Sequence, residues 1–287
     1  MKVAILGIVH PRGLGFLKEN GFQIFEIKNF EIENLKEQLK DVDGILLRTS
    51  KLGKDILQHC NNLKIISRHG VGYDNVDLDF LNKNKIALGI TSTSNAVSVA
   101  EHVLSFFIYI TKNFSLSDRL VKEGNFEKRS QLPNFFELYK KKVLIIGFGR
   151  IGKEVAKRCL GFDMEVYVYD PFLDNKIIIK DQCVPIEKNR GLEIADFVTI
   201  HLPLNENTKN FISQSEFNMM KKNSVLVNTS RGGIVNEDDL YKALKSKKIK
   251  GAGMDVFVSE PPEANHPFFK LDNILLTPHN AALTLEC

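Results

Sequence analysis

Three polar side chains in the second half of the chain each follow a short apolar run. Arg231 comes after SVLVNTS, Glu260 after GMDVFVS and His279 after ILLTP. Runs of this kind predict buried parallel strands, and open sheets of parallel strands bind ligands at their carboxyl ends. We therefore expect the three side chains to meet at one edge of a sheet.

A guanidinium, a carboxyl group and an imidazole together suit the chemistry of a small 2-hydroxy or 2-oxo acid. Arg231 offers paired planar donors for a carboxylate or a carbonyl oxygen, and His279 can exchange a proton near neutral pH. Glu260, bonded to the other ring nitrogen, would favour the protonated ring. His201 also ends an apolar run, FVTI, so on chemistry alone it is a rival acid or base.

A glycine-rich turn predicts a dinucleotide site. The stretch KVLIIGFGRIG is a buried strand that runs into Gly147, Gly149 and Gly152 and then into a helical segment. Such glycines permit a sharp bend, the approach of a pyrophosphate and close helix packing, with the phosphates at the helix start beside Arg150. Asp170 ends the next apolar run, where an acidic residue binds the ribose hydroxyls and favours NAD over NADP. The alternative is a tight turn with a capping aspartate and no ligand.

Two series of short apolar runs, separated by helical patterns, surround these residues. They are KVAILG, FQIFEI, GILLRTS, LKIISRHG and KIALGIT, and then KVLIIG, EVYVYD, FVTIHLP, SVLVNTS, GAGMDVF and ILLTP. This alternation predicts βαβ units, and hence an α/β fold with two doubly wound parallel sheets. A long helix from Asn95 to Asn113 connects the two series. We expect a substrate domain over residues 1–95, to which residues 281–287 could return, and a Rossmann NAD-binding domain over residues 96–280.

The composition fits two compact domains that fold without disulfides or metal. The chain has 287 residues, 43% of them hydrophobic, and a net charge of +4 spread along its length. Four cysteines without a paired motif favour reduced thiols and a cytoplasmic location, and the most apolar stretch is far shorter than the ~20 residues of a membrane helix. The lysines between Lys245 and Lys250 are interpreted as a solvated helix end, and the chain has no nucleic-acid-binding motif.

The chain resembles the D-isomer-specific 2-hydroxyacid dehydrogenases, in particular those of the D-3-phosphoglycerate dehydrogenase type. Seven segments carry the resemblance in one order. They are RHGVGYDNVDL (68–78), NAVSVAEH (95–102), GFGRIG with Asp170, HLPLNENT (201–208), NTSRGGIVNEDDL (228–240), GMDVF followed by SEPP, and TPHNA (277–281). The resemblance implies a flavodoxin-like first domain and NAD-dependent hydride transfer at C2 of a D-2-hydroxy or 2-oxo acid of the phosphoglycerate, glycerate or lactate type.

The resemblance also implies a role for each matching residue. Arg231, Glu260 and His279 would be catalytic, which decides for His279 over His201. The residues implied on the cofactor side are Gly147, Gly149, Arg150, Ile151, Gly152, Asp170, His201, Pro203, Thr208, Asn228, Thr229, Ser230 and Asp255. Those implied on the substrate side are Gly70, Val71 and Gly72, with Arg48 and Arg68 as candidates for a second acidic group.

Two further expectations concern partners and an alternative function. The apolar face of the helix from Asn95 predicts packing against a second copy, and so a homodimer. Family members usually carry a tryptophan before the cofactor domain, and Phe126 stands where this chain would have it. The alternative function is an NAD(H)-sensing binding module of the same fold with little or no turnover.

Overall fold

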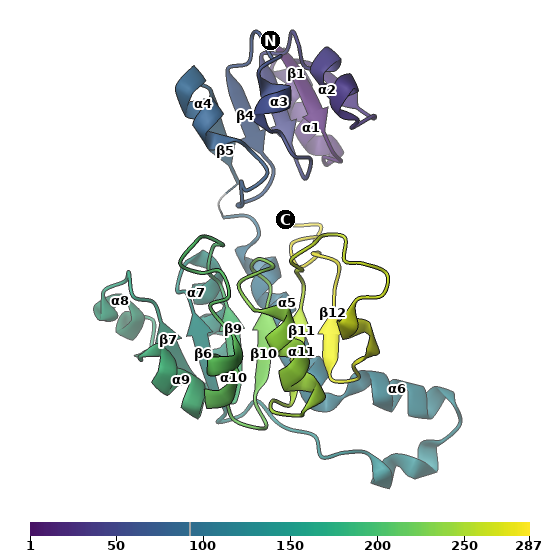
Figure 1. Cartoon of the computed structure of the whole chain (residues 1–287), viewed down its shortest axis with the longest axis vertical. Coiled ribbons are helices and arrows are strands. Elements are labelled where there is room, and N and C mark those ends of the chain that lie inside the picture. The colour runs from purple at the N-terminus through teal and green to yellow at the C-terminus, as the bar shows by residue number, and fades with distance from the viewer. Residues whose placement is uncertain (92) are drawn as a thin grey trace. The chain divides into compact units, whose positions relative to one another are not determined.

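The computed structural model describes residues 1–91 and 93–287 and divides into two compact units (Figure 1). The first unit is Met1–Asn95 and the second is Ala96–Cys287. Each unit is built on one sheet of parallel strands connected by helices, so the predicted α/β fold class is confirmed. The last residues of the chain group with the second unit, where Thr284 Oγ1 lies 2.8 Å from Ser98 Oγ.

The first unit is a five-stranded sheet in the order β2-β1-β3-β4-β5. Its strands are β1 (Lys2–Leu6), β2 (Gln23–Ile27), β3 (Gly44–Leu47), β4 (Ile65–Arg68) and β5 (Ala87–Ile90). Its helices are α1 (Pro11–Glu19), α2 (Ile32–Gln38), α3 (Lys54–Leu57) and α4 (Leu78–Asn84). The strand order reverses between β1 and β3, and such a reversal opens a crevice at the carboxyl ends of the two strands.

The second unit is a seven-stranded sheet in the order β12-β11-β10-β9-β6-β7-β8. Its strands are β6 (Lys142–Ile146), β7 (Glu165–Tyr169), β8 (Val184–Pro185), β9 (Phe197–Ile200), β10 (Val225–Asn228), β11 (Gly251–Met254) and β12 (Ile274–Leu276). Every pair of neighbouring strands in it is parallel. The order reverses between β6 and β9, as in dinucleotide-binding folds.

Helices cover both faces of the second sheet. Helices α5 (Ala96–Lys112), α7 (Arg150–Gly161) and α8 (Asn175–Lys180) contribute to the buried core on one face, and α9 (Lys188–Ile194), α10 (Gln214–Met219) and α11 (Glu237–Lys245) contribute to the core on the other. Helix α6 (Phe114–Lys122) and the 3₁₀ helix η1 (Phe126–Gln131) extend away from the sheet (Figure 1), and a second 3₁₀ helix, η2 (Pro267–Lys270), precedes β12. Along β6, Val143 and Ile145 belong to one buried core, whereas Leu144 and Ile146 belong to the other. Because both faces are covered, this strand reads as a continuous apolar run.

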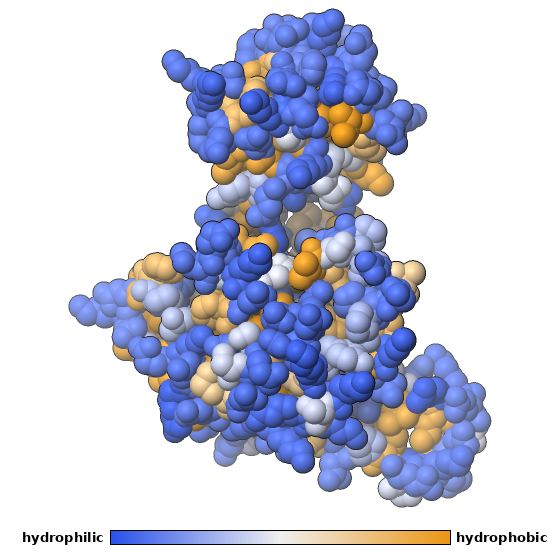
Figure 2. Space-filling view, in the orientation of Figure 1, coloured by the Kyte–Doolittle hydropathy of each residue, from blue (hydrophilic) through white to orange (hydrophobic). Residues whose placement is uncertain are grey.

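Helix α5 packs within its own unit. Its buried side chains include Val103, Phe106 and Phe107, and it lies against α7 and against strands β10 to β12. A Cβ on Gly253 of β11 would lie 2.7 Å from the Phe106 ring, which shows how close the helix comes to the sheet. The expectation that this helix presents its apolar face to a second copy is therefore wrong, because the face is already buried. Apolar side chains are exposed instead on α6 and η1, visible as orange patches in Figure 2.

Candidate functional site

The turn between β6 and α7 is closely packed at two glycines and open at a third. Gly147 has a φ of +91°, and a Cβ there would lie 2.7 Å from the carbonyl oxygen of His201. A Cβ on Gly152 would collide with the carbonyl group of Gly147. An added Cβ on Gly149 would meet nothing within 4 Å. The open backbone at this third glycine is where a pyrophosphate can approach the turn.

Helix α7 begins directly after the open glycine. Its N-cap residue, Gly149, carries no side chain, so the first N–H groups of the helix receive no side-chain cap. These N–H groups and the positive end of the helix dipole favour a phosphate. Arg150 is exposed at the helix start, while Ile151 packs against the core beneath the helix. The start of α7 therefore has the donors and the charge that a diphosphate needs.

Asp170 fastens the glycine turn to the end of β7. Its Oδ2 accepts a hydrogen bond from the N–H of Phe148 at 2.8 Å, and its Oδ1 accepts one from the N–H of Phe172 at 3.0 Å. The structural role considered from the sequence, that of a capping aspartate, is thus present. Each oxygen keeps a second lone pair, so recognition of a ribose at this position stays a prediction.

His201 lies beside the glycine turn and is held in its neutral form. Its Nε2 lies 3.0 Å from the Thr199 hydroxyl, and burial lowers the pKa of the ring to about 3. The loop that follows is closed by Thr208, whose hydroxyl donates to the Pro203 carbonyl at 2.6 Å and accepts from the N–H of Asn205 at 2.8 Å. A histidine that stays neutral across the working pH range is a poor proton donor.

The end of β10 holds Arg231 in a tightly bonded turn. Asn228 is buried, and its Oδ1 accepts from both the N–H and the hydroxyl of Ser230, at 3.0 and 2.7 Å. Its Nδ2 donates to the Arg231 carbonyl at 2.9 Å, and Arg231 Nη1 donates to the Ser230 carbonyl at 2.7 Å. A Cβ on Gly232 would collide with the carbonyl of Phe257. The arginine turn thus lies against the backbone that follows β11.

Glu260 and His279 form a direct pair. His279 Nδ1 donates a hydrogen bond to Glu260 Oε2 at 2.7 Å, and Glu260 Oε1 accepts one from the N–H of Phe257 at 3.0 Å. Since the arginine turn also lies against Phe257, one backbone segment connects all three predicted catalytic residues. The engaged Nδ1 leaves Nε2 as the ring nitrogen that can face a substrate.

The pair lines a largely apolar pocket of about 460 Å³. Its other walls include Phe257, Phe269 and Leu276. The pair itself is open to solvent at one side, with 48% of the His279 side chain and 39% of the Glu260 side chain exposed, so a substrate can reach the imidazole.

Asp255 lies beneath the histidine segment. Its side chain is fully buried, and Oδ1 accepts hydrogen bonds from the Thr277 hydroxyl at 2.5 Å and from the N–H of Asn280 at 2.9 Å. Oδ2 accepts from the N–H of Ala281 at 3.0 Å, and the Asp255 carbonyl accepts from the N–H of His279 at 2.8 Å. This carboxylate therefore holds the segment in which His279 adopts a left-handed φ of +51°. A cofactor contact of Asp255 stays a prediction.

Sequence reasoning gave no role to His102, which extends this network. Its Nε2 donates to the Thr277 hydroxyl at 3.1 Å and lies 3.8 Å from Asp255 Oδ1. Its ring packs edge-on against Phe106, with 4.7 Å between the ring centres. Burial lowers the pKa of His102, and the nearby Asp255 carboxylate opposes that shift. The available signal was a histidine placed on the buried face of an otherwise apolar helix.

The predicted substrate residues of the first unit follow β3 and β4. Arg48 Nη1 donates to the Ile8 carbonyl at 3.2 Å, at the ends of β1 and β3 where the strand order reverses. The N–H of Gly70 donates to the Thr91 hydroxyl at 2.7 Å, so this amide is already engaged. The amides of Val71 and Gly72 make no hydrogen bond to any residue that the structure describes. Of the three predicted anion-binding amides, two are therefore available.

Polar atoms at the carboxyl edge of the second sheet fit a polar cofactor. His201 Nδ1, Thr229 Oγ1 and Asn280 Oδ1 are buried without a hydrogen-bond partner among the described residues. They follow β9, β10 and β12, and the glycine turn follows β6 of the same parallel sheet. Buried polar atoms need partners, and a bound dinucleotide would supply them. Across residues 1–91 and 93–287, no cluster of three histidine, cysteine or acidic side chains could hold a metal ion, and no helix could span a membrane.

The parallel sheet and the glycine turn are those of an α/β dinucleotide-binding protein. Comparisons with known proteins agree with this class. Residues 104–281 match the family model described as "D-isomer specific 2-hydroxyacid dehydrogenase, NAD binding domain". The chain is 34% identical over its whole length to a D-3-phosphoglycerate dehydrogenase of Archaeoglobus fulgidus, of which it covers 54%. It is 34% identical to a glyoxylate reductase of Thermofilum pendens, with 99% of this chain and 86% of the relative aligned.

A solved structure gives the same result. The chain is similar to D-lactate dehydrogenase of Aquifex aeolicus complexed with NAD and lactic acid, with a TM-score of 0.85 and 27% identity over 99% of this chain and 90% of that one. The chain belongs to the D-isomer-specific 2-hydroxyacid dehydrogenase family, and its cofactor is NAD. It spans about half the length of the D-3-phosphoglycerate dehydrogenases that it matches.

Proposed function

We propose that the chain catalyses NAD-dependent interconversion of a D-2-hydroxy acid and the corresponding 2-oxo acid. The observation that carries this proposal is the 2.7 Å hydrogen bond between His279 Nδ1 and Glu260 Oε2. The pair lies at the carboxyl edge of the second sheet, the same edge at which the glycine turn follows β6. An imidazole positioned by a carboxylate at a dinucleotide-binding edge supports proton exchange with the substrate oxygen.

His279 acts through its Nε2 atom. During reduction Nε2 donates a proton to the carbonyl oxygen of the 2-oxo acid, and during oxidation the neutral ring accepts the hydroxyl proton. Glu260 fixes the ring orientation and stabilises the positive charge of the protonated ring. Bound NAD supplies the group that takes up the hydride during oxidation and, as NADH, returns it during reduction. Arg231 supplies planar donors for the substrate carboxylate or carbonyl oxygen.

His201 is not the residue that exchanges a proton with the substrate oxygen. Burial lowers the pKa of His201 to about 3, so at neutral pH its ring is neutral and not the imidazolium that would act as the acid. We expect His279→Ala to lower kcat by roughly 10²- to 10⁴-fold, the usual contribution of a positioned acid or base. His201→Ala should keep most of kcat and change mainly the affinity for the cofactor. Loss of turnover in the His201 variant, with turnover kept in the His279 variant, would reverse the assignment.

The positive field of the first unit supports a substrate with a second acidic group. Burial, together with the charges of Arg48 and Arg68, lowers the pKa of His69. Arg48 follows β3 and Arg68 is the last residue of β4, and the two available amides of Val71 and Gly72 come soon after it. A doubly acidic 2-oxo acid, such as the phosphorylated one of the phosphoglycerate type, would use both the amides and the guanidinium groups.

A panel of 2-oxo acids tests the proposal. Purified chain would be mixed with NADH and phosphohydroxypyruvate, hydroxypyruvate, glyoxylate or pyruvate, and the loss of NADH absorbance would be followed. We expect the phosphorylated acid to be reduced with the highest kcat/KM, and Arg48→Gln to raise KM for it more than for pyruvate. Tight binding of NADH without reduction of any acid would instead favour the NAD(H)-sensing module.

A further inference from the structure

A second pocket lies at the opposite edge of the NAD-binding sheet. It measures about 500 Å³, and its lining comes from three stretches that precede β10, β11 and β12. The glycine turn and the Glu260–His279 pair follow the carboxyl ends of strands of this same parallel sheet. The pocket is therefore separated from the proposed active site by the full length of the strands. Its volume is in the usual range for small-molecule sites.

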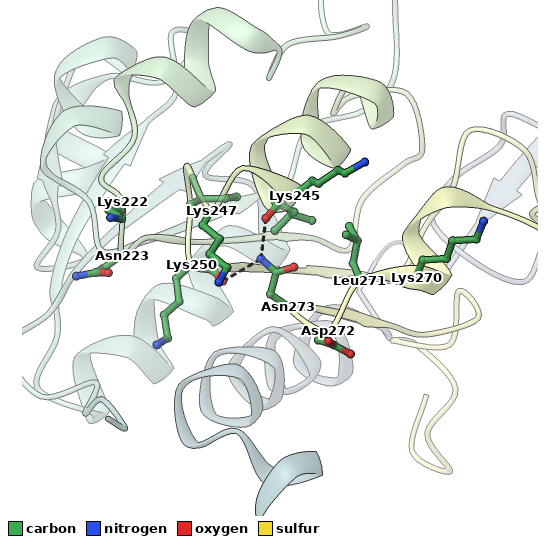
Figure 3. A pocket seen from close by; sticks show the side chains of 11 residues that line it. Lys222, Asn223, Lys245, Lys247, Lys250, Lys270, Leu271, Asp272 and Asn273 are labelled. Atoms are coloured by element: carbon green, nitrogen blue, oxygen red, sulfur yellow. Dashed lines mark hydrogen bonds between the residues drawn. The ribbon is translucent and has the colours of Figure 1, made fainter. Parts of the chain in front are cut away.

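Five lysines line this pocket against one carboxylate. They are Lys222, Lys245, Lys247, Lys250 and Lys270, and the carboxylate is that of Asp272. Figure 3 shows that the five lysines extend from these three stretches and lie around Asn273. None of the five lysines makes an ion pair with a carboxylate of residues 1–91 or 93–287. The pocket thus has a positive charge that neighbouring side chains leave unbalanced.

A solvated helix end does not account for this arrangement. Lysine in the last turn of a helix complements the negative end of the helix dipole, and Lys245 at the end of α11 fits that explanation. Lys222, Lys250 and Lys270 come from other elements, so the dipole of α11 gives no reason for them. The last carbonyls of α11 are also satisfied locally, because Leu244 O accepts from the N–H of Lys247 at 3.1 Å.

The frame beneath the lysines is preformed. Asn273 Nδ2 donates to the carbonyl of Leu244 at 3.1 Å and to that of Lys250 at 3.4 Å, which fixes the end of α11 to the start of β11 (Figure 3). The N–H of Lys250 donates to the Ser224 carbonyl at 2.9 Å, which adds the start of β10. A Cβ on Gly251 would lie 2.9 Å from the Asn273 carbonyl oxygen, so the backbones meet without space for a side chain. A fixed frame reduces the entropy lost when a ligand binds.

One lysine is already partly removed from water. Lys250 Nζ lies 4.0 Å from the centre of the Phe136 ring, and burial lowers the pKa of this ammonium group. A partly desolvated ammonium group interacts more strongly with an anion than a fully hydrated one does. Lysine binds phosphate as a point charge, without the paired geometry with which arginine recognises carboxylates. Because the basic groups of the lining are all lysines, the pocket favours phosphate groups over a planar dicarboxylate.

We propose that this lysine pocket is a second binding site, separate from the NAD site, for a small polyphosphate such as the polyphosphate group of a nucleotide. The ammonium groups of the five lysines point in different directions in Figure 3, and four of the lysines are exposed, so their flexible side chains can turn toward a compact ligand of several negative charges in the pocket. A nucleic acid would instead need basic groups spread in a stripe along an extended surface.

Inorganic tripolyphosphate tests the site because it contains no base or ribose that the NAD site could recognise. It would be titrated calorimetrically at low salt into the full chain saturated with NADH, which blocks the helix start of α7. We expect one equivalent to bind. The triple variant Lys245→Gln, Lys247→Gln, Lys270→Gln should weaken binding by about tenfold or more. A matched triple that removes exposed lysines elsewhere, Lys18→Gln, Lys83→Gln, Lys128→Gln, should change affinity by less than about twofold.

Asp272→Asn is expected to raise the affinity for tripolyphosphate. A misfolded variant would not bind more tightly, so this result would not be explained by misfolding. The substitution removes the one carboxylate of the pocket, so we expect tripolyphosphate to bind roughly two- to fivefold more tightly. The proposal is overturned if no saturable binding is observed, or if both lysine triples lose affinity equally, since diffuse charge would then explain the binding. It is also overturned if a single-stranded oligonucleotide saturates this surface while tripolyphosphate does not.

Discussion

The hydroxyl of Thr277 donates a hydrogen bond of 2.5 Å to the buried carboxylate of Asp255. The hydroxyl oxygen of Thr277 also accepts a hydrogen bond from His102 Nε2 at 3.1 Å. The side chains of His102, Thr277 and Asp255 therefore form a hydrogen-bonded chain from α5 to the end of β11. Two residues after Thr277, His279 adopts its left-handed backbone conformation and contacts Glu260. We infer that this network positions the imidazole on which the proposed proton transfer depends.

Replacement of Thr277 tests the positioning. Thr277→Val keeps the volume but removes a donor from a buried carboxylate, and should lower the free energy of unfolding by about 1–3 kcal/mol. It should also lower kcat more than it raises KM, because the His279 segment loses a constraint. Thr277→Ser keeps the hydroxyl and serves as the control. Equal urea-unfolding curves and equal kcat for the two variants would show that the hydroxyl does not matter.

The glycine turn predicts opposite outcomes for two alanine substitutions. Gly149→Ala adds a methyl group in open space, so the melting temperature should stay near that of the original chain. The added group nonetheless occupies the approach of the pyrophosphate, and NADH should bind about tenfold more weakly or worse.

Gly152→Ala is the matched variant of the same turn. Its Cβ would collide with the carbonyl of Gly147, so the second unit should lose stability by about 1–3 kcal/mol. Thermal melting and NADH titration distinguish the two effects. A stable Gly152→Ala chain, or a Gly149→Ala chain with unchanged NADH affinity, would contradict this account of the turn.

The glycine turn also illustrates what the sequence could predict. Apolar runs predicted eleven strands that the structure contains, because strands buried on both faces are continuously apolar. The strand missed was β8, whose two residues pair with the edge of β7 and are too few to produce a pattern. The glycines of the turn and the residues of the Glu260–His279 pair could also be predicted from the sequence, since each follows a predicted strand.

Contacts between distant side chains could not be predicted in the same way. Nothing in the spacing of His102, Asp255 and Thr277 indicates that the three side chains meet, because α5 has to pack on the sheet before they do. The sequence also did not predict that the Gly70 amide donates to the Thr91 hydroxyl and is thus not available to a substrate. Thr91 follows the next strand, β5, so this contact too depends on how the chain packs. The predicted exposure of the apolar face of α5 is wrong, because periodicity shows that a face is apolar but not what covers it.

Acid sensitivity should follow from His201. Burial lowers its pKa to about 3, whereas the unfolded chain binds a proton at this ring below about pH 6.5. The unfolded state therefore holds more protons between these values, and stability falls as the pH drops from about 6.5 toward 3. His201→Gln should reduce this slope, which is at most about 1.4 kcal/mol per pH unit for one group. Urea unfolding at about pH 7 and about pH 5 measures it, and identical slopes would mean that the ring is not desolvated.

The exposed apolar side chains of α6 and η1 predict the oligomeric state. Phe114, Val121 and Phe126 are 48%, 55% and 52% exposed, and large apolar side chains gathered on one segment usually mark an interface. We expect a homodimer in sedimentation at micromolar concentration, formed through this segment. The double variant Val121→Glu, Phe126→Glu should then sediment as a monomer that still binds NADH. Phe16→Glu, at a 64% exposed position on α1, should leave the dimer intact, and a monomeric original chain would refute the expectation.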